Sequence, residues 1–170
     1  MIFKLGNVKE KRPFFSTIES MQSDWQTEIE FLDTHPSDKI TPYPDKMRIY
    51  IDSCTARQSL YPWAKDVAAE MRTVFHKNHI SLIKFYSFGE SGASYPWHKD
   101  KMDVFLVQSQ GSCLIRVENT NCENTARPFN PGDCVFIPRG THHEITPSRS
   151  RVTYSFGVEG EPDPQSYIAI

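Results

Sequence analysis

Apolar residues recur in short runs along most of the chain, and these runs have the length of β-strands. The segment Met47–Asp52 alternates apolar and polar positions, and 79–88 is rich in branched and aromatic side chains. From Val104 onward, short apolar runs recur about every 8–12 residues, with turn residues between them. This spacing predicts a mainly β protein, built as a sandwich or barrel.

Two segments in the first half show helical spacing instead. The first begins at Ser16, which offers a hydroxyl cap with an acidic residue three positions later. The second begins at Tyr61, and Pro62 suits the first turn of a helix. The apolar positions that define the two stripes are Ile18, Met21, Trp25, Ile29 and Leu32 in the first, and Val67, Ala68, Met71, Val74 and Phe75 in the second.

The length and composition indicate one domain. The chain has 170 residues, of which 38% are hydrophobic and 12% aromatic, enough to bury a single core. No internal repeat or linker divides it. We expect helices and an extra strand in 1–80, the barrel in 81–158, a proline-rich tail in 159–170 and an exposed polar loop over 119–130.

The charge balance excludes some classes of partner. The chain carries 19 Lys and Arg against 21 Asp and Glu, which argues against a surface that binds polyanions. No apolar run approaches the roughly 18 residues of a membrane span, and the N-terminus has no signal-peptide core. We therefore expect a cytoplasmic protein without a membrane partner. The cysteines form no C-x-x-C pair, which favours reduced thiols at Cys54, Cys113, Cys122 and Cys134.

A group of potential metal ligands stands out between 89 and 157. His98 and Asp100 are two residues apart, so on an extended strand both side chains leave from the same face. A later strand begins with His142 and His143, either of which offers a third ligand. Two histidines and one carboxylate suit octahedral Fe(II) with open positions, whereas structural zinc requires four ligands. An H-x-D motif or a pair of adjacent histidines occurs often by chance, and only the joint placement of the two indicates a metal site.

The spacing around these ligands resembles that of a known superfamily. Gly92 precedes His98 with five residues between them, and 132–143 fits the pattern G-x5-P-x-G-x2-H. Both motifs resemble those of the cupin superfamily, and H-x-D resembles its iron oxygenase branch. The pattern H-x-D-x-x-D-V-F-L-x-Q-x-x-G over 98–111 looks like that of JmjC-type protein hydroxylases, particularly ribosomal oxygenases. The segments 138–144 and 153–157 are similar to the family's distal-histidine strand and the strand after it.

The resemblance implies a double-stranded β-helix, the cupin or jelly-roll fold, braced by the N-terminal helices. It implies iron ligands at His98, Asp100 and His143, with His142 pointing to the other side of its strand. The implied activity is that of an Fe(II)- and 2-oxoglutarate-dependent dioxygenase that hydroxylates a C–H bond of a protein, peptide or amino-acid side chain. Tyr86 and Tyr95 occupy regions from which related enzymes draw hydrogen-bond donors for 2-oxoglutarate.

The sequence departs from the family pattern where the cosubstrate is anchored. JmjC-type enzymes usually place a Lys or Arg two residues beyond the glycine that matches Gly111, and this chain has Cys113 there. Burying a carboxylate without a cation is costly. Arg151 and Thr153 resemble the R-x-S/T element of other 2-oxoglutarate oxygenases, so we expect them to bind the carboxylate from a different strand. The alternative is that Arg151 is an exposed surface residue.

Two other classes of function stay open at this point. One is a cupin dioxygenase that does not use 2-oxoglutarate, although such enzymes more often have three histidines. The other is a non-catalytic cupin that binds a metabolite. A free amino acid or another small molecule is an alternative substrate, and the near-neutral charge argues against charge-driven binding of nucleic acid. The pattern carries no signal of an oligomeric state.

Overall fold

The computed structural model describes residues 5, 8–34, 40–42, 47–52, 61–77, 79–88, 95–122, 124–147 and 149–159. Three features of the sequence lie outside these residues: Gly92 of the first motif, Cys54, and the expected tail beyond 159. The other three cysteines are free thiols, as expected. Within the described ranges, no helix has the length and apolar character needed to cross a membrane.

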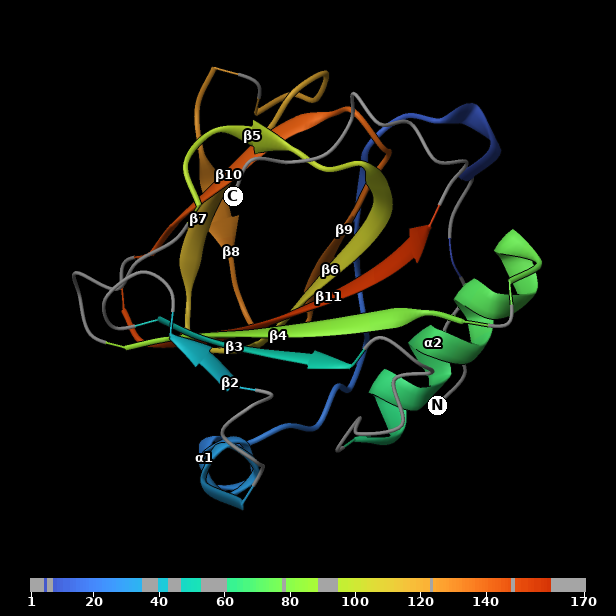
Figure 1. The fold of residues 1–170 in the computed structure, drawn as a ribbon. Coiled ribbons are helices and arrows are strands. Elements are labelled where there is room, and N and C mark those ends of the chain that lie inside the picture. The colour runs from blue at the N-terminus through green and yellow to red at the C-terminus, as the bar shows by residue number, and fades with distance from the viewer. Residues whose placement is uncertain are drawn as a thin grey trace.

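Two antiparallel sheets face one another (Figure 1). The large sheet has the strand order β1-β9-β6-β11-β4-β3-β2, and the small sheet has the order β5-β10-β7-β8. The strands are β1 (Phe14–Thr17), β2 (Ile40–Pro42), β3 (Met47–Asp52), β4 (Ser81–Ser87), β5 (His98–Lys99), β6 (Met102–Gln110), β7 (Cys113–Val117), β8 (Arg127–Phe129), β9 (Asp133–Ile137), β10 (His142–Pro147) and β11 (Arg151–Glu159). A short 3-10 helix, η1 (Val8–Glu10), precedes them.

The eight strands from β4 to β11 wind back and forth between the two sheets. Strands β4, β6, β9 and β11 are neighbours in the large sheet, and β5, β7, β8 and β10 form the small one. This is the double-sheet jelly roll, so the predicted fold is confirmed. The predicted strand β3 pairs with β4 and extends the large sheet, also as expected.

The large sheet separates two hydrophobic cores. Because side chains alternate along a strand, β11 sends Val152, Tyr154 and Phe156 toward the helices, and Arg151 and Thr153 toward the small sheet. Both sets are buried. The second core lies between the sheets and contains Val104, Leu106, Cys113, Ile115, Val117, Phe129, Val135 and Ile137.

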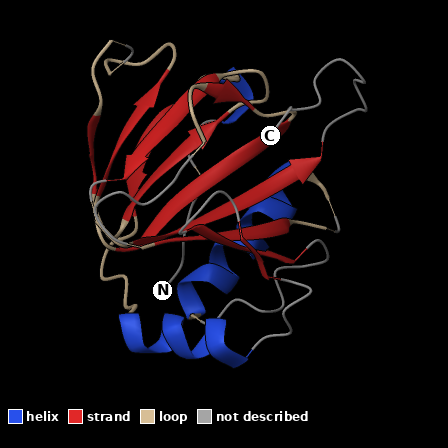
Figure 2. Cartoon of the chain, turned by 60° about the vertical axis from the view of Figure 1, so that its left-hand side comes forward, coloured by secondary structure: helices blue, strands red, loops and turns tan. Residues whose placement is uncertain are grey.

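The helices α1 (Trp25–Thr34) and α2 (Pro62–Phe75) lie on the side of the large sheet that faces away from the small sheet (Figures 1 and 2). Helix α2 begins at Pro62, as its sequence predicts, and His76 ends it with a left-handed φ of 53°. Its apolar stripe packs on the sheet through Trp63, Ala64, Val67, Ala68 and Met71.

The prediction of a helix starting at Ser16 was wrong. Ser16 and Thr17 belong to β1, which pairs with β9. Ser20 has a left-handed φ of 54°, which no helix residue adopts, so the backbone turns before α1 begins. The cap is Asp24, whose Oδ1 accepts a 2.8 Å hydrogen bond from the Thr27 amide. Ile18 is therefore apolar for another reason than helix formation. It follows the end of β1 and is buried in the core between the large sheet and the helices.

The expected polar loop over 119–130 also needs correction. It contains the three-residue strand β8, which pairs with β7, and both Cys122 and Phe129 are buried. Strand β8 is too short for alternation to mark it in the sequence. Pairing with β7 is what orders this segment, and that contact is set by the tertiary structure.

Candidate metal centre

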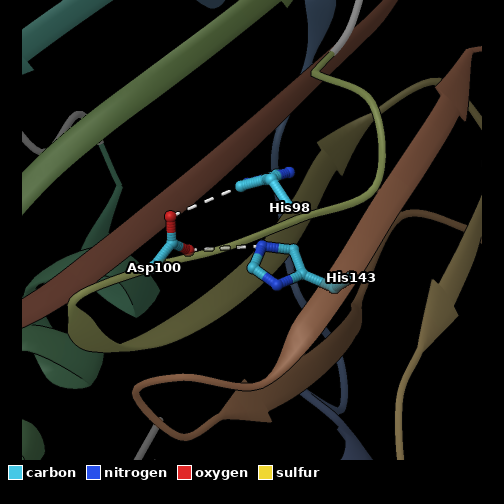
Figure 3. Close-up of side chains that lie close together, drawn as sticks. All are labelled: His98, Asp100 and His143. Atoms are coloured by element: carbon cyan, nitrogen blue, oxygen red, sulfur yellow. Dashed lines mark ion pairs between the residues drawn. The ribbon is translucent and has the colours of Figure 1, made fainter. Parts of the chain in front are cut away.

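The small sheet brings the three predicted ligands together at one end. His98 on β5 lies directly opposite His143 on β10, and Asp100 follows β5 by one residue. Each of the three offers one ligand atom, and these atoms all lie within 4.8 Å of one another. Figure 3 shows the three side chains converging on one point. His143 is buried, whereas His98 and Asp100 are partly exposed.

The carboxylate of Asp100 lies between the two imidazoles. Its Oδ2 is 3.2 Å from Nε2 of His143, and its Oδ1 is 3.7 Å from Nε2 of His98 (Figure 3). The centroids of the two rings are 4.3 Å apart. All three donor atoms thus point into the same small volume, as one bound ion requires.

Backbone carbonyl groups orient both imidazole rings. Nδ1 of His98 lies 2.7 Å from the carbonyl oxygen of Pro96, and Nδ1 of His143 lies 3.1 Å from that of Thr141. Because a carbonyl oxygen only accepts hydrogen bonds, these contacts fit rings whose Nδ1 donates to the backbone and whose Nε2 faces the site as the ligand atom. This is the arrangement that metal-binding histidines adopt, so the three residues fit a divalent metal ion.

Local electrostatics favour the neutral form of His98. Burial lowers its pKa, and the neighbouring His143 acts in the same direction. The Pro96 carbonyl and the Asp100 carboxylate oppose this shift. The net direction is downward, which favours the unprotonated Nε2 that can bind a metal.

A tight turn at 138–141 sets the position of His143. The amide of Thr141 donates to the carbonyl of Pro138 at 3.1 Å, and Gly140 has a φ of +84° that favours glycine. Two hydrogen bonds tie this turn to the other ligand segment. The Gly140 amide donates to the carbonyl of Asp100 at 2.9 Å, and the Arg139 amide donates to Oδ1 of Asp103 at 2.8 Å.

Replacing Asp103 with alanine is therefore expected to weaken metal binding without removing a ligand. The turn loses the hydrogen bond from the Arg139 amide to this carboxylate, and we expect Co(II) affinity to fall about tenfold, as for other outer partners of metal ligands. Asp103→Asn should keep most of the affinity, because its amide oxygen can still accept from Arg139. Calorimetric titration with Co(II) measures both. Equal affinities for the wild-type protein and Asp103→Ala would show that the turn needs no support from this carboxylate.

His142 points to the opposite side of β10, as the alternation along the strand predicts. Oε2 of Glu118 accepts a hydrogen bond from the His142 amide at 3.0 Å and lies 3.2 Å from Nδ1 of its ring. The amide hydrogen bond is the main cause of a lowered pKa at Glu118. Trp97 stacks on the His142 ring at 5.8 Å between centroids. His142 is thus part of the outer surface of the small sheet.

A second polar group faces the space between the sheets. Arg151 is only 2% exposed, so the alternative that it is a surface residue is wrong. Its Nη1 donates to Oγ1 of Thr153, which in turn donates to Oε1 of Gln108, both at 2.6 Å. Nε2 of Gln108 donates to the backbone carbonyls of Gln110 and Gly111, which fixes the orientation of the amide. The direction of the whole hydrogen-bond chain is therefore determined.

Cys113 lies close enough to Arg151 for the guanidinium charge to act on the pKa of its thiol. Burial raises the pKa of the Cys113 thiol to about 11, and the Arg151 charge opposes this rise. Gly111, which follows β6, permits the close approach of the segment before β11, because a Cβ at this position would overlap the carbonyl oxygen of Ser150. Cys113, at the position where JmjC-type enzymes usually carry the anchoring cation, therefore faces the same interior space as Arg151.

The two candidate tyrosines lie in different places. Tyr95 packs edge-on against His98, with 5.6 Å between ring centroids, and so lies beside the ligand triad. Tyr86 points to the helix side of the large sheet, where its hydroxyl donates to Glu28 at 3.2 Å. The prediction for Tyr86 was wrong because 82, 84 and 86 are the helix-facing positions of β4. Ser87, which no sequence motif singles out, faces the interior opposite Arg151.

The fold of this chain is similar to that of several solved structures. No family model matches the sequence, and no curated protein matches it either. The structure of YcfD, a ribosomal oxygenase from Escherichia coli, is similar with a TM-score of 0.63 and 18% identity, covering 97% of this chain and 54% of YcfD. A structure of YcfD in complex with cobalt and 2-oxoglutarate is similar with a TM-score of 0.59 and 19% identity, covering 92% of this chain and 50% of YcfD.

A shorter protein also has a similar fold. KdgF from Halomonas sp. has a TM-score of 0.50 and 15% identity, covering 76% of this chain and 93% of KdgF. The chain thus spans about half the length of YcfD and nearly all of KdgF. At these identities the comparisons confirm the cupin fold and the predicted structural resemblance to the barrel of ribosomal oxygenases.

Proposed function

We propose that this protein is an Fe(II)- and 2-oxoglutarate-dependent dioxygenase that hydroxylates a C–H bond. The observation that carries the proposal is the triad of His98, Asp100 and His143, with both Nε2 atoms and the carboxylate directed to one point. Three protein ligands on one side of a metal ion would leave coordination positions open for a cosubstrate and dioxygen. This is the arrangement of non-heme Fe(II) oxygenases. The complex of YcfD with cobalt and 2-oxoglutarate supports this reading, because that neighbour shares the fold.

The residues of the barrel would divide the work between metal and cosubstrate. His98, Asp100 and His143 would hold the iron, which supplies the activation of dioxygen for C–H oxidation. Arg151 would clamp the distal carboxylate of 2-oxoglutarate, with Thr153 and Gln108 holding the guanidinium in place. Tyr95, beside His98, is the remaining candidate for a hydrogen bond to the cosubstrate. The apolar residues between the sheets would keep water from this space.

We further propose that the oxidised group belongs to a protein, peptide or amino-acid side chain. The near-neutral charge of the chain agrees with such a substrate better than with a nucleic acid. The assay is 2-oxoglutarate-dependent succinate release against a panel of peptides, amino acids and nucleosides. Coupled release with a nucleoside alone would contradict this assignment of the substrate class.

Anaerobic titration with Fe(II) and 2-oxoglutarate tests the proposed function. We expect a weak visible charge-transfer band that appears only when both are present, because 2-oxoglutarate would chelate the iron. Iron binding without the band would instead favour a cupin dioxygenase that does not use 2-oxoglutarate. If the protein binds no iron, a metabolite-binding cupin becomes the better assignment.

A further inference from the structure

A buried hydroxyl stands directly opposite Arg151 in the large sheet. Ser87 is the last residue of β4, and antiparallel pairing places its Cα opposite that of Arg151 on β11. Residues paired in this way project from the same face of the sheet, so the Ser87 side chain shares the interior side with Arg151. The side chain is fully buried.

The hydroxyl of Ser87 has no hydrogen-bond partner within the part of the chain that the structure describes. Most buried hydroxyl groups in proteins are paired, because an unpaired one has given up its hydrogen bond to water without replacement. The other interior-facing positions nearby on β4 are apolar, at Ile83 and Phe85. A serine at 87 therefore costs stability that an alanine there would not cost.

A carboxylate ligand would explain this cost. A carboxylate has about four lone-pair sites, and a guanidinium that binds it through two parallel hydrogen bonds leaves sites open. Arg151 comes from β11 and Ser87 from the neighbouring β4, and because their Cα atoms are paired, both side chains leave from the same face of the large sheet. Thr153 cannot serve as this donor, since its hydroxyl already donates to Gln108.

We propose that Ser87 is a ligand-binding residue whose hydroxyl donates a hydrogen bond to the distal carboxylate of 2-oxoglutarate, beside the Arg151 guanidinium. This inference rests on the proposed function, because it assigns one more residue to the cosubstrate of that reaction. It also gives Ser87 a part in specificity. The residue distinguishes a 2-oxo diacid from a 2-oxo acid that lacks the second carboxylate.

The variant Ser87→Ala tests the proposal through two effects of opposite sign. Without ligand, the variant should melt at the same temperature as the wild-type protein or above it, because it removes an unpaired buried hydroxyl. On Co(II)-loaded protein, its Kd for 2-oxoglutarate in calorimetry should rise about tenfold, the effect of losing one hydrogen bond to a charged group. A purely structural serine would not produce this combination.

Two matched comparisons complete the experiment. The probe 2-oxopentanoate lacks the distal carboxylate, so its Kd should be the same for Ser87→Ala and the wild-type protein. Ser112→Ala removes a hydroxyl that bonds to Asn130 in a nearby turn, and it should leave the Kd for 2-oxoglutarate unchanged. An equal Kd for 2-oxoglutarate in Ser87→Ala and wild type would overturn the role of Ser87 alone. A wild-type protein that binds no 2-oxoglutarate would overturn the proposed function as well.

Discussion

Replacing Asp100 with alanine is expected to abolish specific metal binding and, with it, any coupled turnover. Asp100 supplies the only carboxylate of the triad, and its two oxygens face Nε2 of both histidines. Its loss leaves two neutral imidazoles, which attract a divalent cation far less than a site with one negative charge. We expect Co(II) affinity to fall by more than about 100-fold, beyond the range for outer partners of metal ligands.

The measurement is calorimetric titration of the variant with Co(II), with the visible Co(II) spectrum as a second readout. Asp33→Ala is the matched control, because this carboxylate is exposed on α1 and should leave the affinity unchanged. Circular dichroism checks that Asp100→Ala keeps its sheet content. The assignment of the triad fails if the folded variant binds Co(II) as tightly as the wild-type protein.

Replacing Arg151 with methionine is expected to remove 2-oxoglutarate binding while metal binding remains. The guanidinium is buried between the sheets, where a low dielectric strengthens its attraction for a carboxylate. Burial also lowers the pKa of Arg151, so an anion beside it offsets the cost of the buried charge. Methionine keeps much of the side-chain length without charge. We expect the Kd for 2-oxoglutarate to rise about 100-fold, as for the loss of a bidentate charged pair.

The comparison of two ligands separates an anchor from a general loss of structure. Co(II) affinity should stay within about twofold of wild type, because Arg151 is not a metal ligand, and the Kd for 2-oxopentanoate should also stay the same. Arg149→Ala, two residues away and exposed, is the control for the loss of a positive charge. If Arg151→Met binds 2-oxoglutarate as tightly as the wild-type protein, Arg151 is not the anchor, and a different residue must bind the distal carboxylate.

The ligand triad could be predicted because its evidence is local. His98 and Asp100 are two residues apart on an extended segment, and the spacing from the turn at 138–141 selects His143 over its neighbour His142. Such features depend on a few adjacent residues and on turn chemistry. Helix α2 and strand β3 were predictable for the same reason, since each carries its own period and boundary residues.

Other features depend on contacts between distant segments. Ser16 fits both a helix cap and an edge strand, and pairing with β9 decides for the strand. Tyr86 and Ser87 are neighbours, yet one faces Glu28 and the other faces the barrel interior. A shift of one residue in the strand register would exchange the faces on which these two side chains lie. The sequence alone does not specify this register.

By itself, the sequence predicted the mainly β barrel, the three residues of the candidate metal centre, and Arg151 as the proposed anchor for a carboxylate. Short-range periodicity and turn residues predict the strands, and the motifs that resemble those of known oxygenases single out the ligands and Arg151, because both kinds of signal act over a few positions. Only the tertiary structure decided which side of each strand faces the interior. Pairing between strands far apart in the chain buries Arg151, turns Tyr86 toward the helices and sets Ser87 opposite Arg151 in the large sheet.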